Sequence, residues 1–223
     1  MDRQIAQKFS QELNIEPTQI AREEWELIIL GGLFESELGT NIVFRGGTAL
    51  RLAYNSPRFS EDLDFSILKD TSPNKFQNII QRITDRFSQI KITDLASKYY
   101  THLAELRIKE DWLNDAFHIK IEVSRRKDYK KGAGYELILL ASPVTNVQTL
   151  GNVSTLEQIF KEKLAAIQSR KLGRDLFDLW FISQKLKKDV DFSKYNFTKK
   201  QLKYELSRFL PKNYWDFFEK LGR

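Results

Sequence analysis

Two aspartates separated by a single residue constrain the fold of this chain most, because they stand within an apolar segment. Asp62 and Asp64 alternate with Leu63 and Phe65, and alternate residues of a β-strand point to the same face of a sheet. The two carboxylates therefore converge on one spot, where they repel each other unless a cation lies between them. Hard oxygen ligands of this kind suit Mg²⁺ or Mn²⁺. The pattern predicts a strand that carries a divalent-metal site.

A glycine pair precedes this strand, between a short apolar segment (42–44) and a segment that reads as the start of a helix. Gly46 and Gly47 lack a Cβ, so the backbone there can approach a ligand closely, and amides at a helix N-terminus favour an anionic group such as a triphosphate. Thr48 adds a hydroxyl at the same place. An isolated glycine pair is more typical of an ordinary turn. Only its combination with the two aspartates predicts a site for a nucleotide together with its metal.

Composition fits a folded enzyme of one core or two small lobes, since the 223 residues are 41% hydrophobic and include 16 Phe and 4 Trp. The absence of cysteine excludes disulfides, thiolate catalysis and Cys-based zinc sites, and two histidines leave any metal chemistry to carboxylates. No apolar run is long enough to span a bilayer, and the N-terminal segment lacks the apolar core of a signal peptide. We expect a cytoplasmic protein without a membrane partner.

The formal net charge of +6 favours an anionic partner. Basic residues cluster in two runs that also contain aromatic side chains. The first run holds Arg125, Arg126, Lys127, Tyr129, Lys130 and Lys131, and the second extends from Lys185 to Lys203 with Tyr195 and Phe197. Basic side chains beside aromatic rings suit a phosphate backbone and unstacked bases, whereas each run taken alone also fits a solvated surface. Next to a nucleotide site, the runs favour a polynucleotide acceptor.

Hydrophobic periodicity predicts an α/β first part and an all-α second part. We expect helices at about 3–12 and 18–38 and from Pro73, and strands at about 42–45, 63–68, 101–108, 117–124 and 135–140. From Thr155 onward the pattern is helical. The predicted domains are an α/β lobe with N-terminal helices over residues 1–150 and a C-terminal helical lobe over 151–223 that completes the cleft.

The glycine pair and the aspartates resemble the signature of the polymerase-β-type nucleotidyltransferase superfamily. The wider set of motifs resembles the AbiEii nucleotidyltransferase toxin family of type IV toxin–antitoxin systems. These motifs are Gly46-Gly-Thr-Ala-Leu-Arg-Leu, Arg58-Phe-Ser-Glu-Asp-Leu-Asp-Phe, Ile121-Glu-Val-Ser, Lys163-Leu-Ala-Ala and Arg174-Asp-Leu-Phe-Asp-Leu-Trp. The resemblance implies an α+β fold, with a polymerase-β-like mixed sheet flanked by helices and followed by a C-terminal helical bundle.

The resemblance also implies roles for residues of the helical half. Lys163 is expected to reach the active site, where a cation neutralises triphosphate charge, although it also fits a surface lysine. Asp175 and Asp178 lie one helical turn apart, and the resemblance favours one of them in the site. We assign Asp175 to catalysis with Lys163 and the two strand aspartates, and Asp178 to a structural or nucleobase-side role.

For three further residues the sequence fits both a role in the site and a structural role. Glu122 stands on the polar face of a strand that could neighbour the Asp62–Asp64 strand, where the superfamily often has a third metal carboxylate; it equally fits a surface pair with Lys120 or His118. Arg58 and Ser60 directly precede the acidic strand. They are placed either to orient phosphate or to stabilise the loop.

The function implied by the resemblance is a metal-dependent toxin that transfers NMP from an NTP to RNA. One ion held by Asp62 and Asp64 would grip the NTP, and a second, shared with Glu122, would acidify the acceptor hydroxyl. By analogy the acceptor is the tRNA 3′ end, translation is blocked, and a cognate antitoxin is encoded nearby. Two alternatives are a nucleotidyltransferase acting on a protein or small molecule, and a non-catalytic RNA- or partner-binding module.

Overall fold

The computed structural model describes residues 1–126, 129 and 132–222. Lys127, Lys130 and Lys131 of the first basic run lie outside the described residues. The helices are α1 (Arg3–Leu13), α2 (Pro17–Phe34), α3 (Gly46–Tyr54), α4 (Pro73–Thr84), α5 (Leu156–Arg170), α6 (Gly173–Leu186), α7 (Lys199–Leu206) and α8 (Asp216–Leu221). The strands are β1 (Ile42–Arg45), β2 (Asp62–Ile67), β3 (Ile90–Ser97), β4 (Thr101–Ile108), β5 (Phe117–Ser124), β6 (Tyr135–Ser142) and β7 (Thr145–Ser154).

All these strands form one mixed sheet in the order β3-β4-β5-β2-β1-β7-β6. β2 is parallel to β5 and antiparallel to β1, while β1 is parallel to β7. The acidic strand is therefore central, between β5 and β1. The predicted α+β class with a mixed sheet is confirmed.

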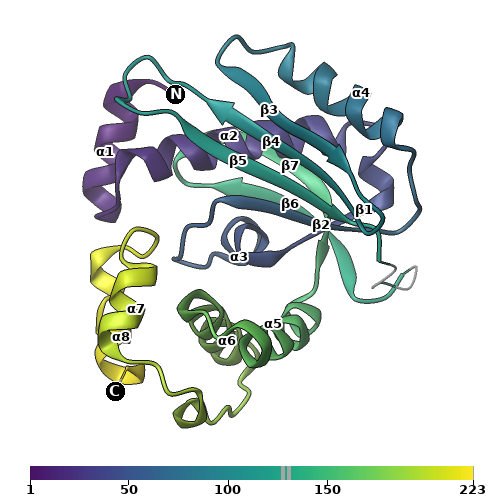
Figure 1. The fold of residues 1–223 in the computed structure, drawn as a ribbon. Coiled ribbons are helices and arrows are strands. Elements are labelled where there is room, and N and C mark those ends of the chain that lie inside the picture. Colours follow the sequence, from purple (N-terminus) through teal and green to yellow (C-terminus); the bar gives the residue numbers. More distant parts are fainter. Residues whose placement is uncertain (127–128, 130–131, 223) are drawn as a thin grey trace.

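The described residues pack into two large hydrophobic cores and a small third one around Ala6, Ile20 and Phe59. The larger core joins the sheet to α2 and α4 and is built around buried side chains such as Leu30, Phe65 and Phe76. The second core joins the C-terminal helices to one another and to Leu50 of α3. Figure 1 shows α3 between the sheet and the α5–α6 pair. The helix that begins with the glycine pair thus connects the two halves of the molecule.

Two strands were not predicted. β3 has only one strongly buried position, Ile90, and a register shift between Ile92 and Asp94 interrupts its alternation. β7 contains Asn, Gln and Gly, which are weak strand formers; a Cβ at Gly151 would lie 2.3 Å from the Phe34 ring, so packing requires the glycine there.

Two other observations concern the sequence-based boundaries, and a third concerns membrane-spanning helices. α2 ends at Phe34, four residues before the predicted end at residue 38. β7 continues to Ser154, across the proposed lobe boundary at residue 150, and the division into lobes stays a prediction. Among the described residues, no helix combines the length and the apolar character needed to cross a bilayer.

Candidate active site

The two aspartates of β2 stand on one face of the sheet, opposite charged residues of both neighbouring strands. Asp64 pairs in register with Arg45 of β1 and Glu122 of β5, and Asp62 pairs with Lys120 of β5. Residues directly opposite on neighbouring strands point to the same side. The sheet register therefore gathers three carboxylates and two cations at the centre of one face.

Burial and mutual repulsion govern the ionisation of the aspartates. Burial raises the pKa of both carboxyls above the ordinary value, and the charge of Asp62 raises that of Asp64 further. Lys120 lowers the pKa of Asp62 and so partly offsets the burial. Such a pair is stabilised either by a proton or by a bound cation. Two partly desolvated carboxylates of this kind fit a divalent metal.

The structure shows features of both interpretations of Glu122. It faces Asp64 across the β2–β5 register, and its Oε2 lies 2.6 Å from Nζ of Lys120. Within the described ranges, no group of three His, Cys, Asp or Glu side chains is arranged to hold a metal. The metal role of Glu122 stays a prediction.

The glycine pair begins α3 at the edge of the same site. Gly46 has φ +83°, and a Cβ there would lie 2.7 Å from Oδ2 of Asp64. A Cβ at Gly47 would lie 2.3 Å from Nη2 of Arg58 and 2.8 Å from Oγ of Ser60. No side chain caps the first turn of α3. The helix N-terminus therefore presents backbone amides where an anion can approach.

We expect Gly47→Ala to weaken both folding and NTP binding. The added methyl must displace Arg58 from a buried ion pair, at a cost of about 1–3 kcal/mol for overpacking, and it occupies the space beside the backbone amides that we predict to bind phosphate. Thermal unfolding and NTP titration measure the two effects. Gly31→Ala is the matched control, because nothing lies within 4 Å of its added Cβ and alanine favours a helix interior. Equal unfolding temperatures and NTP affinities for both variants would contradict the assignment.

Thr48 has a different position from the one predicted. Its side chain is fully buried, and its hydroxyl donates a hydrogen bond of 2.7 Å to the backbone carbonyl of Asp62. It does not line the pocket. The hydroxyl thus makes a structural contact, which ties the first turn of α3 to the acidic strand, and the nucleotide contact of Thr48 stays a prediction.

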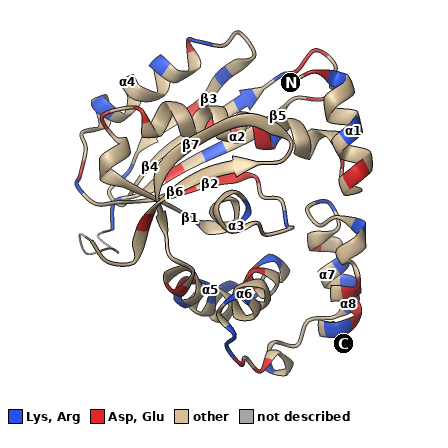
Figure 2. Ribbon diagram, turned by 180° about the vertical axis from the view of Figure 1, so that it is seen from behind, with Lys and Arg blue, Asp and Glu red and all other residues tan. Residues whose placement is uncertain are grey.

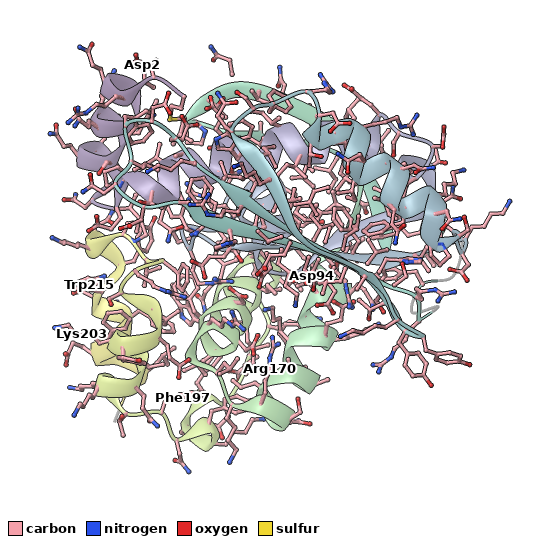
Figure 3. All side chains as sticks on the ribbon, turned by 45° about the horizontal axis from the view of Figure 1, so that its top comes forward. Asp2, Asp94, Arg170, Phe197, Lys203 and Trp215 are labelled. Carbon is pink, nitrogen blue, oxygen red and sulfur yellow. The ribbon has the colours of Figure 1, made fainter. Side chains whose placement is uncertain are left out.

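An ionic network around two buried carboxylates lies at the edge of the site and connects α5, α6 and the loop before β2. Arg58 donates from Nε and Nη2 to the two oxygens of Asp178 at 2.7 and 2.9 Å. Nζ of Lys163 lies 2.7 Å from Oδ2 of Asp178 and 2.9 Å from Oδ1 of Asp175. Arg170 completes the network with a 2.7 Å hydrogen bond to Asp175, and Figure 3 labels this arginine.

Asp175 and Asp178 are fully buried and do not line the pocket. Burial raises the pKa of each carboxyl, but the neighbouring cations reverse the effect: Arg170 and Lys163 lower the pKa of Asp175, and Arg58 and Lys163 lower that of Asp178 to about 2. Both aspartates hold cations at the pocket wall through these ion pairs. The catalytic role of Asp175 and the nucleobase-side role of Asp178 stay predictions.

The pocket itself is a polar cavity of about 410 Å³ between the sheet and α5–α6. Of the predicted residues, it is lined by Gly46, Gly47, Arg58, Ser60, Asp62, Asp64, Glu122 and Lys163. It also contains Arg45, Lys120, Glu162, Arg170 and Arg174, which the sequence analysis did not assign to the site. Figure 2 shows acidic positions on the central strands and basic positions on α5 and α6. The arrangement suits a polyanion held against a carboxylate pair.

The missed cations had weak sequence signals. Arg170 and Arg174 precede the predicted Asp175 by five residues and by one, but they belong to two different helices, so helical spacing does not bring them together. Lys120 alternates with Glu122 and could have been inferred from the same strand face. Arg45 depends on the β1–β2 register, which its own segment does not reveal.

Comparison with known proteins matches residues 28–209 to the family model described as nucleotidyl transferase AbiEii toxin, type IV TA system. Among solved structures, JHP933 from Helicobacter pylori is similar with a TM-score of 0.59 and 24% identity over 86% of this chain and 79% of that one. MenT4, a nucleotidyltransferase toxin from Mycobacterium tuberculosis, is similar with a TM-score of 0.61 and 19% identity over 91% and 69%. Curated protein sequences give no match. The structural likenesses support the same fold.

Proposed function

Because this chain belongs to the AbiEii family of nucleotidyltransferase toxins from type IV toxin–antitoxin systems, we propose that it transfers NMP from an NTP to an RNA hydroxyl. The acceptor we propose is the 3′ end of tRNA, where an added nucleotide blocks aminoacylation and halts translation. The family gives the nucleotidyl transfer and implies an antitoxin partner. The acceptor, the metal and the site residues are our proposal.

The observation that carries the proposal is the joint position of the carboxylate pair and the glycine turn. Asp64 lies so close to Gly46 that even a methyl group there would collide with its carboxylate. A triphosphate bound to the first amides of α3 is thereby placed beside Asp62 and Asp64. A Mg²⁺ or Mn²⁺ ion held by Asp62 and Asp64 would supply charge neutralisation at the phosphates.

The other pocket residues position charge around the reacting phosphate. Transfer joins the acceptor oxygen to the α-phosphorus, breaks the bond to the bridging oxygen of pyrophosphate and releases the hydroxyl proton to solvent. Such a reaction depends on positioning and electrostatics more than on covalent catalysis. Lys163 and Arg58 are fixed by Asp178 at the pocket wall, so their orientation is set before substrate binds. They stabilise the negative charge of the departing pyrophosphate.

Incubation with Mg²⁺, total tRNA and each α-³²P-labelled NTP in turn tests the proposal, with products separated on a denaturing gel. Periodate-oxidised tRNA is the matched acceptor, because periodate cleaves the 2′,3′-diol of the terminal ribose to a dialdehyde and leaves the rest of the tRNA intact. We expect label on intact tRNA and none on oxidised tRNA. Label on oxidised tRNA would contradict the 3′ end as acceptor. Label confined to protein or small molecules would contradict an RNA acceptor and support the alternative nucleotidyltransferase reaction.

A further inference from the structure

Two tyrosines form an exposed aromatic pair at the tip of the β3–β4 hairpin. Tyr99 is 80% exposed and Tyr100 is 55% exposed. Their ring centroids lie 4.5 Å apart with an interplanar angle of 89°. Aromatic side chains usually bury most of their surface in cores and interfaces. Two neighbouring rings that stay exposed to water therefore indicate a binding surface.

The backbone of this tip is held firmly. Lys98 and Thr101 exchange backbone hydrogen bonds of 2.8 and 3.4 Å, which leaves the two tyrosines as the turn residues. The backbone N–H of Arg125 donates to the carbonyl of Tyr100 at 2.8 Å, and its guanidinium bonds the carbonyl of Lys98 at 3.2 Å. Short hairpin turns favour Gly, Asn and Asp. Turn formation therefore does not account for a Tyr-Tyr sequence.

Positive charge accompanies the aromatic pair. The guanidinium of Arg126 lies 5.1 Å from the centroid of the Tyr100 ring, and both Arg126 and Lys98 are exposed. The C-terminal basic run differs, because there Lys188 and Lys203 lie over Phe160 and Trp215 of the helical lobe itself. Arg126 of the first run, by contrast, lies over a ring that is itself more than half exposed at the hairpin tip.

The hairpin tip adjoins the active site through β5. Glu122 lines the pocket, and Arg125, which bonds the tip, follows three residues later, about 10 Å away at roughly 3.3 Å per strand residue. An RNA chain whose end occupies the pocket can therefore reach the tip with its preceding nucleotides. A phosphate backbone suits the cations, and unpaired bases suit the rings, because every base offers a face for stacking.

We propose that Tyr99, Tyr100 and Arg126 form a stacking platform for the unpaired nucleotides that precede the 3′ end of the acceptor RNA. This inference rests on the proposed function. It adds that the protein selects acceptors with a single-stranded 3′ segment. A fully base-paired end presents no free base faces to the rings and binds more weakly.

Fluorescence anisotropy with a labelled 12-nucleotide single-stranded RNA tests the platform without requiring catalysis. We expect the double variant Tyr99→Ala/Tyr100→Ala to raise Kd about 10-fold or more, as removal of base–aromatic stacking does. Tyr99→Phe/Tyr100→Phe retains the rings and should stay within about 2-fold of wild type. Tyr204→Ala is the matched control, since Tyr204 is 87% exposed on α7 away from the sheet, and should leave Kd unchanged.

Transfer assays separate this inference from the proposed function. A nucleoside acceptor has no preceding nucleotide that could reach the tip, so we expect equal kcat/KM for wild type and the alanine double variant with that acceptor. With the 12-mer, KM should rise while kcat is unchanged. Unchanged 12-mer binding in the alanine variant, or equal losses in Tyr204→Ala, would overturn the platform and leave the proposed function intact. Failure of wild type to label any RNA would overturn the proposed function, whereas the binding comparison would still decide the platform.

Discussion

Asp64→Asn is expected to lower nucleotidyl transfer by about 10³-fold or more, while the folded protein is retained. The substitution keeps the size of the side chain but removes one charge of the pair, and a loss of this size corresponds to about 4 kcal/mol of transition-state stabilisation. Steady-state kcat/KM with labelled NTP measures the loss. Asp94→Asn, an exposed aspartate of the same sheet, is the control and should retain full activity. Turnover of the Asp64 variant close to that of wild type would contradict the assignment.

Asp64→Asn is also expected to change how the stability of the metal-free protein depends on pH. Burial and Asp62 raise the pKa of Asp64 in the folded state, so the folded protein binds more protons than the unfolded chain between the two pKa values. The contribution of Asp64 to stability is then largest below the unfolded pKa, near 4, and declines as pH rises through the raised folded pKa. We expect this decline to be smaller in Asp64→Asn. Thermal unfolding in chelator from pH 4 to 8 measures it, and an identical profile for both proteins would contradict the repulsion argument.

Asp178→Asn is expected to be the most destabilising single change in the site. It leaves Arg58 and Lys163 buried without their shared carboxylate, and breaking a buried ion pair from one side costs about 3–5 kcal/mol. For a chain of this length that corresponds to a fall in Tm of roughly 10 °C. Asp189→Asn, an exposed aspartate just beyond the end of α6, is the matched control. A loss of activity without a fall in Tm would show that Asp178 contacts substrate instead of anchoring the cations.

The pH dependence of stability also tests whether Asp178 stabilises the fold through its buried ion pairs. The pKa of Asp178 is lowered to about 2, so its contribution is complete above the unfolded pKa of about 4 and is lost as pH falls through the folded value. Wild type should therefore lose stability between about pH 4 and pH 2. Asp178→Asn should lack that part of the loss. Parallel curves for the two proteins over this interval would contradict the buried ion pair.

The sequence predicts those features of the site whose residues lie within one short segment. Asp62 and Asp64 share a strand, and the alternation of that strand alone places them on one face. The glycine pair likewise sits at a strand–helix junction that its flanking residues indicate. In both cases local periodicity determines the geometry, so no tertiary information is needed.

The remaining site features depend on contacts between distant segments. Asp175 and Asp178 share a helix face, but only the packing of α6 against the loop of Arg58 decides that they are buried anchors. The sequence predicts a Thr48 hydroxyl that faces the pocket, whereas in the structure this hydroxyl donates a hydrogen bond to the carbonyl of Asp62. Strand order likewise decides that Arg45 and Lys120 flank the aspartates. Periodicity carries no information about which face of one element meets which face of another.

Diffraction from crystals grown with Mn²⁺ and a non-hydrolysable NTP analogue tests the central claim most directly, because the anomalous signal of manganese locates the ion independently of any activity. We predict an anomalous peak within ligand distance of both Asp62 and Asp64, with the triphosphate against the amides of Gly46 and Gly47. The same crystals of Asp64→Asn should lose the peak. A manganese peak remote from the two aspartates, or an analogue bound elsewhere on the protein, would contradict the assignment of this pocket as the nucleotidyl-transfer site.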